Sequence, residues 1–133
     1  MTLNQQQSTK DISPIDEAKA GLKVFFCAVS EWQLSPHEAM ILLGNPSRSR
    51  YYEYKAGHVR TVSDDFLFRL AHLSIIYRNL KTLYSSQNRS LWLKNGSEPG
   101  SKWRGLSPLN TMLSSIRGVI DVFDHLNGQI GSD

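Results

Sequence analysis

The chain has 133 residues, of which 40% are hydrophobic and 20% are charged, and its formal net charge is +3. This composition excludes a largely disordered chain and is ordinary for one soluble globular domain or two small helical subdomains. The weakly basic balance permits a polyanionic partner without requiring one. A single cysteine, Cys27, excludes an internal disulfide, and we expect it to be a small buried hydrophobe in a reducing compartment.

The N-terminal residues 1–13 are polar and lack an apolar period, which predicts a disordered arm. No cationic leader and no apolar run of membrane length are present, so we expect a cytoplasmic protein without a membrane partner. A helix is predicted from Pro14 to about Ser30, with acidic residues in its first turn. Its apolar face is Leu22, Phe25, Phe26 and Val29.

The segment from 34 to 57 predicts two short helices joined by a tight turn. Ser35 and Glu38 have the spacing of a capping box, and Gly44 is placed to end the first helix. Ser47 can cap a second helix, Arg48 to Ala56, which Gly57 closes. Helix, glycine-containing turn and basic helix is the order of a helix-turn-helix.

The second of these helices separates its side chains in the way that DNA binding requires. Tyr51 and Tyr54 form an apolar stripe, whereas basic and polar residues occupy another face and the N-terminal end, where recognition helices contact bases and phosphates. The predicted DNA-binding residues are Ser47, Arg48, Ser49, Arg50, Tyr52, Lys55 and Arg60. The alternative is a solvated helical hairpin with a few surface arginines.

The longest predicted helix begins after Ser63 and carries a continuous apolar stripe, which is typical of the central packing helix of a bundle. The stripe is Phe66, Leu70, Leu73, Tyr77, Leu80 and Tyr84, widened by Leu67, Ile76 and Leu83, and Arg69, Arg78 and Lys81 are expected on the solvated face.

Three further helices are predicted: Arg89–Asn95, one starting at Pro108 after the Ser107 cap, and Ile116–Asn127, which Gly128 ends. A loop, residues 96–100, separates the first from the others. The prediction is an all-α protein with a helix-turn-helix domain over 14–86 and a second region over 87–133.

The sequence predicts neither an enzyme nor a metal or cofactor site. His37-Glu38 begins a zinc-protease pattern, but Ile41 stands where the second histidine is needed. No nucleophile is paired with a base, so we expect no catalytic residues.

Residues of the C-terminal region resemble the toxin-binding domain of the Xre/MbcA/ParS antitoxins. The motif is Trp92-Leu93, then Trp103-x-Gly105-x-Ser107-Pro108-Leu109 with Met112, then a closing helix from Val119 to Leu126. The upstream segments WQLSPHEAMILLG, SRSRYYEYKAG and SDDFLFRLAHLSIIYRNLKTLY are similar to the Xre-like helix-turn-helix domain of these antitoxins. Together the two parts cover roughly residues 20–128 in the family's order.

This resemblance implies the antitoxin of a type II toxin-antitoxin pair. Its partners would be a cognate toxin, suspected to be of the NAD-degrading RES-domain class, and operator DNA, through which the protein represses its own operon as a homodimer or a higher complex with toxin. The toxin-binding role falls on Trp103, Gly105, Ser107, Pro108, Leu109, Met112 and Phe123. The chain departs from the family pattern at Leu106 and at Ser115-Ile116, where family members carry glycine.

The physical character of the C-terminal region permits the same interpretation. Trp103, Leu109, Met112 and Phe123 supply more apolar surface than a short segment can bury, so we expect a partner to cover the remainder. The alternative is that they pack back on the long helix. Two other functions stay open: a stand-alone transcription regulator whose C-terminal helices only dimerise it, and a helical adaptor that does not bind DNA.

Overall fold

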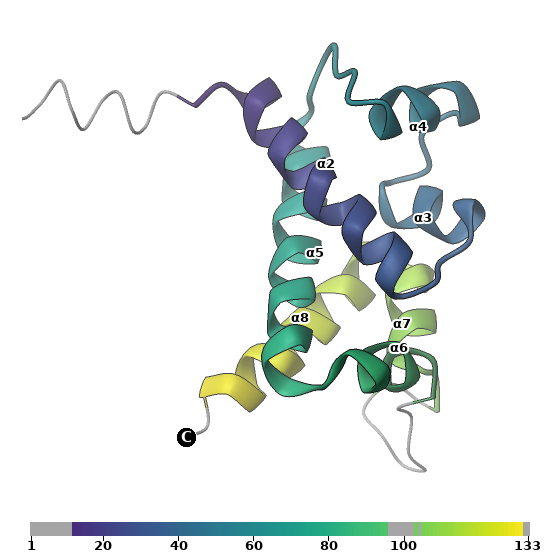
Figure 1. Ribbon diagram of the computed structural model, residues 1–133, viewed down its shortest axis with the longest axis vertical. Helices are drawn as coiled ribbons and strands as arrows, with labels where there is room; N and C mark the ends of the chain where they lie inside the picture. The colour runs from purple at the N-terminus through teal and green to yellow at the C-terminus, as the bar shows by residue number, and fades with distance from the viewer. Residues whose placement is uncertain (1–11, 96–102, 104, 132–133) are drawn as a thin grey trace, which may run out of the picture.

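The computed structural model describes residues 12–95, 103 and 105–131, and every regular element in these ranges is an α-helix (Figure 1). The predicted all-α fold is therefore confirmed for the described part of the chain. Most of the predicted N-terminal arm and the predicted loop at 96–100 lie outside the described residues. The helices are α2 (Pro14–Glu31), α3 (Pro36–Leu42), α4 (Arg48–Lys55), α5 (Asp64–Leu83), α6 (Ser86–Asn95), α7 (Pro108–Ser114) and α8 (Ile116–Gly131).

Serine caps start the helices where the sequence predicts them. The capping box of α3 is complete, because Ser35 Oγ accepts from the Glu38 N–H at 3.1 Å and Glu38 Oε1 accepts from the Ser35 N–H at 2.9 Å. The hydroxyls of Ser47, Ser63 and Ser107 likewise accept from the N–H three residues ahead, at 3.0, 3.1 and 3.0 Å. Each cap satisfies a backbone donor that the first helical turn leaves unpaired.

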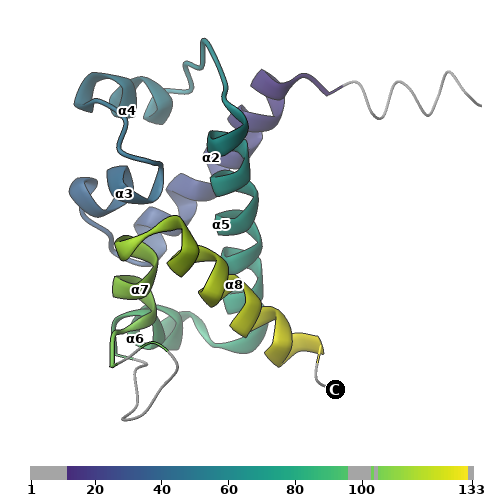
Figure 2. The same cartoon turned by 180° about the vertical axis from the view of Figure 1, so that it is seen from behind.

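The long helix α5 lies at the centre of the bundle, with α2 against one side and α8 along another (Figures 1 and 2). Its buried apolar residues are Phe66, Leu70, Leu73, Ile76 and Leu80. The last helix contributes Val119, Val122 and Leu126 to the same core cluster, which begins at Ala18. The predicted boundary near residue 86 therefore separates two stretches of sequence that share one hydrophobic core.

Two predicted environments were wrong. Cys27 is exposed rather than buried, because Phe25 is only 2% exposed and a residue two positions further along a helix points to the opposite side. Arg69, expected on the solvated face, has a side chain only 18% exposed and pairs with Asp65 at 2.9 Å. A Cβ built on Gly44 would lie 3.1 Å from Arg69 Nε, so this arginine packs under the turn after α3.

Two helix ends were also predicted wrongly. Helix α6 begins at Ser86 rather than at Arg89, and the N–H groups of Asn88 and Arg89 both donate to the Ser85 carbonyl in its first turn. Helix α8 continues past Gly128 to Gly131. A glycine inside a helix costs only about 1 kcal/mol relative to alanine, so packing on α5 can carry the helix through it.

Candidate nucleic-acid interface

The second helix of the helix-turn-helix, α4, is held to the bundle by its two buried tyrosines. Tyr51 is 1% exposed, and its ring lies edge-on to Phe26 of α2 with 5.6 Å between centroids. Tyr54 stacks on Phe66 of α5 at 4.8 Å. Aromatic pairs in this arrangement add to the free energy gained from burial, so one side of α4 is fixed and the other is left to solvent.

The turn between α3 and α4 uses two residues with positive φ. Gly44 has φ of +93° and Asn45 has φ of +63°, which are the residue types that enter the left-handed region at low cost. The Asn45 N–H donates to the carbonyl of Met40 at 2.8 Å and closes the end of α3. This turn sets the direction in which α4 leaves.

The outer face of α4 consists of Arg48, Ser49, Tyr52 and Lys55, all of them exposed. The guanidinium of Arg48 lies 5.9 Å from the centroid of the Tyr52 ring, within the range of a cation–π contact. The predicted sharing of one face by Arg48, Tyr52 and Lys55 agrees with this exposure. Two cations and two hydroxyl groups therefore project from a helix whose opposite side is anchored.

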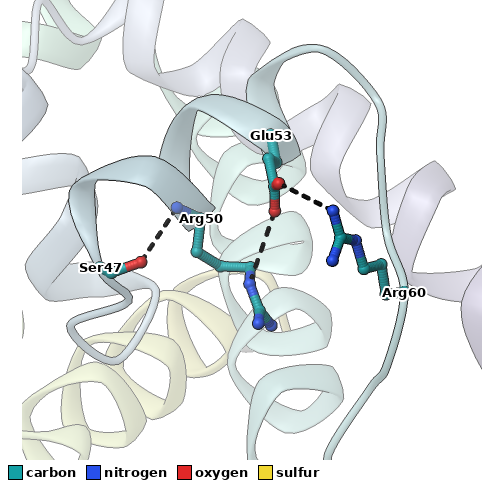
Figure 3. A network of polar contacts seen from close by, with 4 residues as sticks. All are labelled: Ser47, Arg50, Glu53 and Arg60. Carbon is teal, nitrogen blue, oxygen red and sulfur yellow. Dashed lines mark hydrogen bonds and ion pairs between the residues drawn. The ribbon is translucent and has the colours of Figure 1, made fainter.

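The remaining predicted cations are already paired within the chain. Glu53 lies between Arg50, at 3.7 Å from Nε, and Arg60, at 3.3 Å from Nη2 (Figure 3). Figure 3 also shows Ser47 accepting from the backbone N–H of Arg50, so this hydroxyl serves as the helix cap. The Arg60 side chain is 76% exposed and reaches Glu53 from the loop after α4. Glu53 thus offsets part of the positive charge beside the outer face.

Burial raises the pKa of the Tyr51 hydroxyl above its ordinary value, and the neighbouring Tyr52 adds to the shift. Tyr51 is therefore neutral at neutral pH, which suits a side chain that serves as an anchor.

The apolar residues predicted to bind toxin lie mostly in the core of this chain. Trp103, Leu109 and Met112 are 8%, 4% and 2% exposed, and Pro108 is buried as well. The expectation that a partner must cover them was wrong for these residues, because α8 folds back over α7 and α5 and buries them. Phe123 is partly buried, and its ring lies 4.4 Å from that of His72 on α5.

The other two predicted toxin-binding residues have local structural roles. Ser107 caps α7. Gly105 is exposed with φ of +81°, which glycine adopts without strain. Beside it Leu106 is 43% exposed, and Leu91 on α6 is 57% exposed. The apolar surface available at this end of the bundle therefore belongs to residues outside the predicted set.

Sequence reasoning also missed what holds the C-terminal region in place. The ring of His125 stacks on Trp92 at 6.0 Å and meets the edge of Trp103 at 5.1 Å, so it joins α8 to both tryptophans. Asn79, which is 8% exposed in α5, donates to Asn127 Oδ1 at 2.7 Å. An aromatic-rich pattern was visible in the sequence, but its histidine partner and the asparagine pair carry no local pattern that would reveal them.

Within residues 12–95, 103 and 105–131, histidine, cysteine and acidic side chains form no group that could hold a metal ion. None of the helices described in these ranges has both the length and the apolar character that a bilayer crossing needs.

These features define an all-helical protein that presents an anchored helix-turn-helix at one end of a single bundle. No model of a known protein family matches the chain. It is 32% identical over 117 residues to the uncharacterized protein y4oB of Sinorhizobium fredii, covering 84% of this chain and 85% of that protein. The chain belongs to the same protein family as y4oB.

Proposed function

We propose that this protein is the antitoxin of a type II toxin-antitoxin pair that binds operator DNA through α4 and represses its own operon. The observation that carries the DNA-binding half is the capped α3–turn–α4 unit, whose second helix buries Tyr51 and Tyr54 and turns Arg48, Ser49, Tyr52 and Lys55 outward. A helix fixed in this way can enter the major groove without losing its own packing.

The roles on the outer face follow from side-chain chemistry. Arg48 lies in the first turn, where it can donate two hydrogen bonds to a guanine edge. Ser49 and Tyr52 can donate to or accept from bases and phosphates, and Lys55 is a point charge for the phosphate backbone. A two-fold operator would require a homodimer, with one α4 for each half-site.

The antitoxin half of the proposal rests on the resemblance of the C-terminal motif to the toxin-binding domain of the Xre/MbcA/ParS antitoxins. The proposed partner is a toxin of the RES-domain class that degrades NAD, and the antitoxin acts by occluding the mouth of the toxin's active site. Since Trp103, Leu109 and Met112 are covered, the contact falls on the exposed Leu106 and its neighbours.

A second candidate function is favoured by that same burial. If the C-terminal apolar residues serve only the core of this chain, the protein is a stand-alone transcription regulator. It would then bind an operator duplex without a toxic neighbour.

Coexpression with the product of the neighbouring gene tests the antitoxin proposal. The full-length chain should restore growth and co-purify with that product, and Leu106→Asp should reduce both while leaving DNA binding unchanged. Ile12→Asp is the matched control, since Ile12 is also an exposed apolar residue, 62% exposed against 43% for Leu106. If the full-length chain neither restores growth nor retains the product, the antitoxin function is lost. Duplex binding in that case supports the stand-alone regulator.

A further inference from the structure

A groove with a basic rim runs between α2 and the C-terminal end of α4. Its volume is about 520 Å³, and it is lined by Lys19, Leu22, Lys23, Phe26, Cys27, Tyr54, Lys55, Ala56 and Gly57. Three of these residues are lysines and none is acidic. Apolar side chains form much of the remaining lining, which is the surface along which the stems of lysines pack while their ammonium groups reach solvent.

The groove is continuous with the outer face of α4, because Lys55 belongs to both. Lys19 and Lys23 are exposed and lie one helical turn apart on α2, so their ammonium groups can project on the same side. Asp16, in the first turn of α2, is the nearest acidic residue on that side of the helix and is not among the residues that line the groove. A rod of negative charge lying on α4 and passing Lys55 would meet these two lysines next.

We infer that Lys19 and Lys23 bind the sugar–phosphate backbone of the duplex whose major groove α4 enters. This inference rests on the proposed DNA binding and adds a contact from outside the helix-turn-helix. A DNA strand carries one phosphate for each 3.4 Å along the axis, so a strand beside Lys55 presents several phosphates within the length of the groove. Such contacts position the protein on the duplex and carry no sequence information themselves.

An acidic polypeptide is the other polyanion that a lysine-lined groove could accept. The position of the groove favours DNA, because Lys55 already lies on the exposed face of the proposed recognition helix. A polypeptide in the groove would have no reason to extend across that face.

The test compares two double variants that remove the same charge. Lys19→Ala/Lys23→Ala removes the groove lysines, and Lys81→Ala/Lys94→Ala removes two exposed lysines from α5 and α6, at the end of the bundle away from α4 (Figure 1). Affinity is measured by fluorescence anisotropy over a range of salt concentrations, for a duplex from the region upstream of the gene and for an unrelated duplex. Circular dichroism confirms that both variants keep the parent helical content.

The groove variant should weaken binding by a similar factor for both duplexes and lower the slope of log K against log salt by about 1.8, at roughly 0.9 for each phosphate contact. The control variant should stay close to the parent. Equal slopes for the two variants, while the parent binds the upstream duplex, would overturn the inference and leave the proposed function intact. Weaker binding of poly-L-glutamate with unchanged duplex binding would also overturn it, and a parent that binds no duplex would overturn both.

Discussion

The carbonyl oxygen of Thr111 in α7 lies directly against the Cα of Gly118 in α8. A Cβ built on Gly118 would overlap that oxygen and the carbonyl carbon behind it. Thr111 cannot move away easily, because it is 5% exposed and its hydroxyl donates to the Ser107 carbonyl at 2.8 Å. The absence of a side chain at residue 118 therefore lets α7 and α8 approach closely enough for α8 to reach the core.

Gly118→Ala should lower the free energy of unfolding by roughly 1–3 kcal/mol or more, since backbone atoms must shift to admit the methyl group. Urea denaturation followed by circular dichroism measures this. Gly128→Ala on the same helix is the matched control, because nothing lies within 4 Å of its Cβ position. It should raise stability by up to about 1 kcal/mol through helix propensity. Equal effects from the two changes would contradict the close approach.

Arg89→Met should destabilise the protein by about 2–3 kcal/mol by leaving the Glu31 carboxylate partly buried without its cation. Arg89 Nη1 lies 2.8 Å from Glu31 Oε2, and the two side chains are 13% and 23% exposed. Its Nε also donates to the Tyr84 carbonyl at 3.0 Å, so one side chain joins α6 to α2 and to the end of α5. Chemical denaturation gives the difference.

The exposed pair of Arg117 and Asp121, with side chains 75% and 38% exposed, provides the control for that ion pair. Arg117→Met should change stability by less than about 1 kcal/mol, because water screens the pair. An equally small effect of Arg89→Met would show that the bond between α2 and α6 contributes little.

Arg48→Ala should weaken binding of the upstream duplex by roughly 1–3 kcal/mol if the guanidinium contacts a base edge. If it contacts phosphate instead, the loss should be similar for all duplexes and the salt dependence should flatten. Arg117→Ala removes an exposed arginine from α8 and should leave affinity nearly unchanged. An Arg48 variant that binds like the parent would remove this residue from the interface.

Glu53→Gln should strengthen DNA binding, because it removes a negative charge and releases Arg50 and Arg60 for phosphate. Each additional phosphate that these arginines bind should steepen the slope of log K against log salt by roughly 0.9. Asp121→Asn makes the same change of charge beside Arg117 and should have a smaller effect. Equal increases in affinity from both substitutions would indicate a general charge effect and contradict a local role for Glu53.

Stability should fall as the pH rises above 10, because burial raises the pKa of Tyr51 and Tyr84 above the ordinary 10.0. The unfolded chain then loses these protons first, so the stability present below pH 10 is lost as the pH rises through the higher folded pKa values. Urea denaturation at several values between pH 9 and pH 11 measures the slope. The variant Tyr51→Phe/Tyr84→Phe should reduce it, and an unchanged slope would rule out these two tyrosines as the cause.

Local features of the sequence were sufficient for much of the fold. Ser35, Ser47, Ser63 and Ser107 start helices because a hydroxyl can satisfy an N–H three residues ahead whatever surrounds it. Helical periodicity likewise identified the buried stripe of α5 and the separation of Tyr51 from the outer face of α4. These interactions depend on neighbours within a turn or two of the chain.

Only the tertiary structure decided which residues each face meets. Cys27 is exposed, Trp103 is buried, and Glu53 pairs with Arg60, because these outcomes depend on elements that are distant in sequence or on a loop that folds back. The sequence alone determined where helices begin and which sides are apolar, since hydrogen bonds and periodicity are local. It could not determine that α8 would cover α7 and α5, because burial depends on the packing of the whole chain.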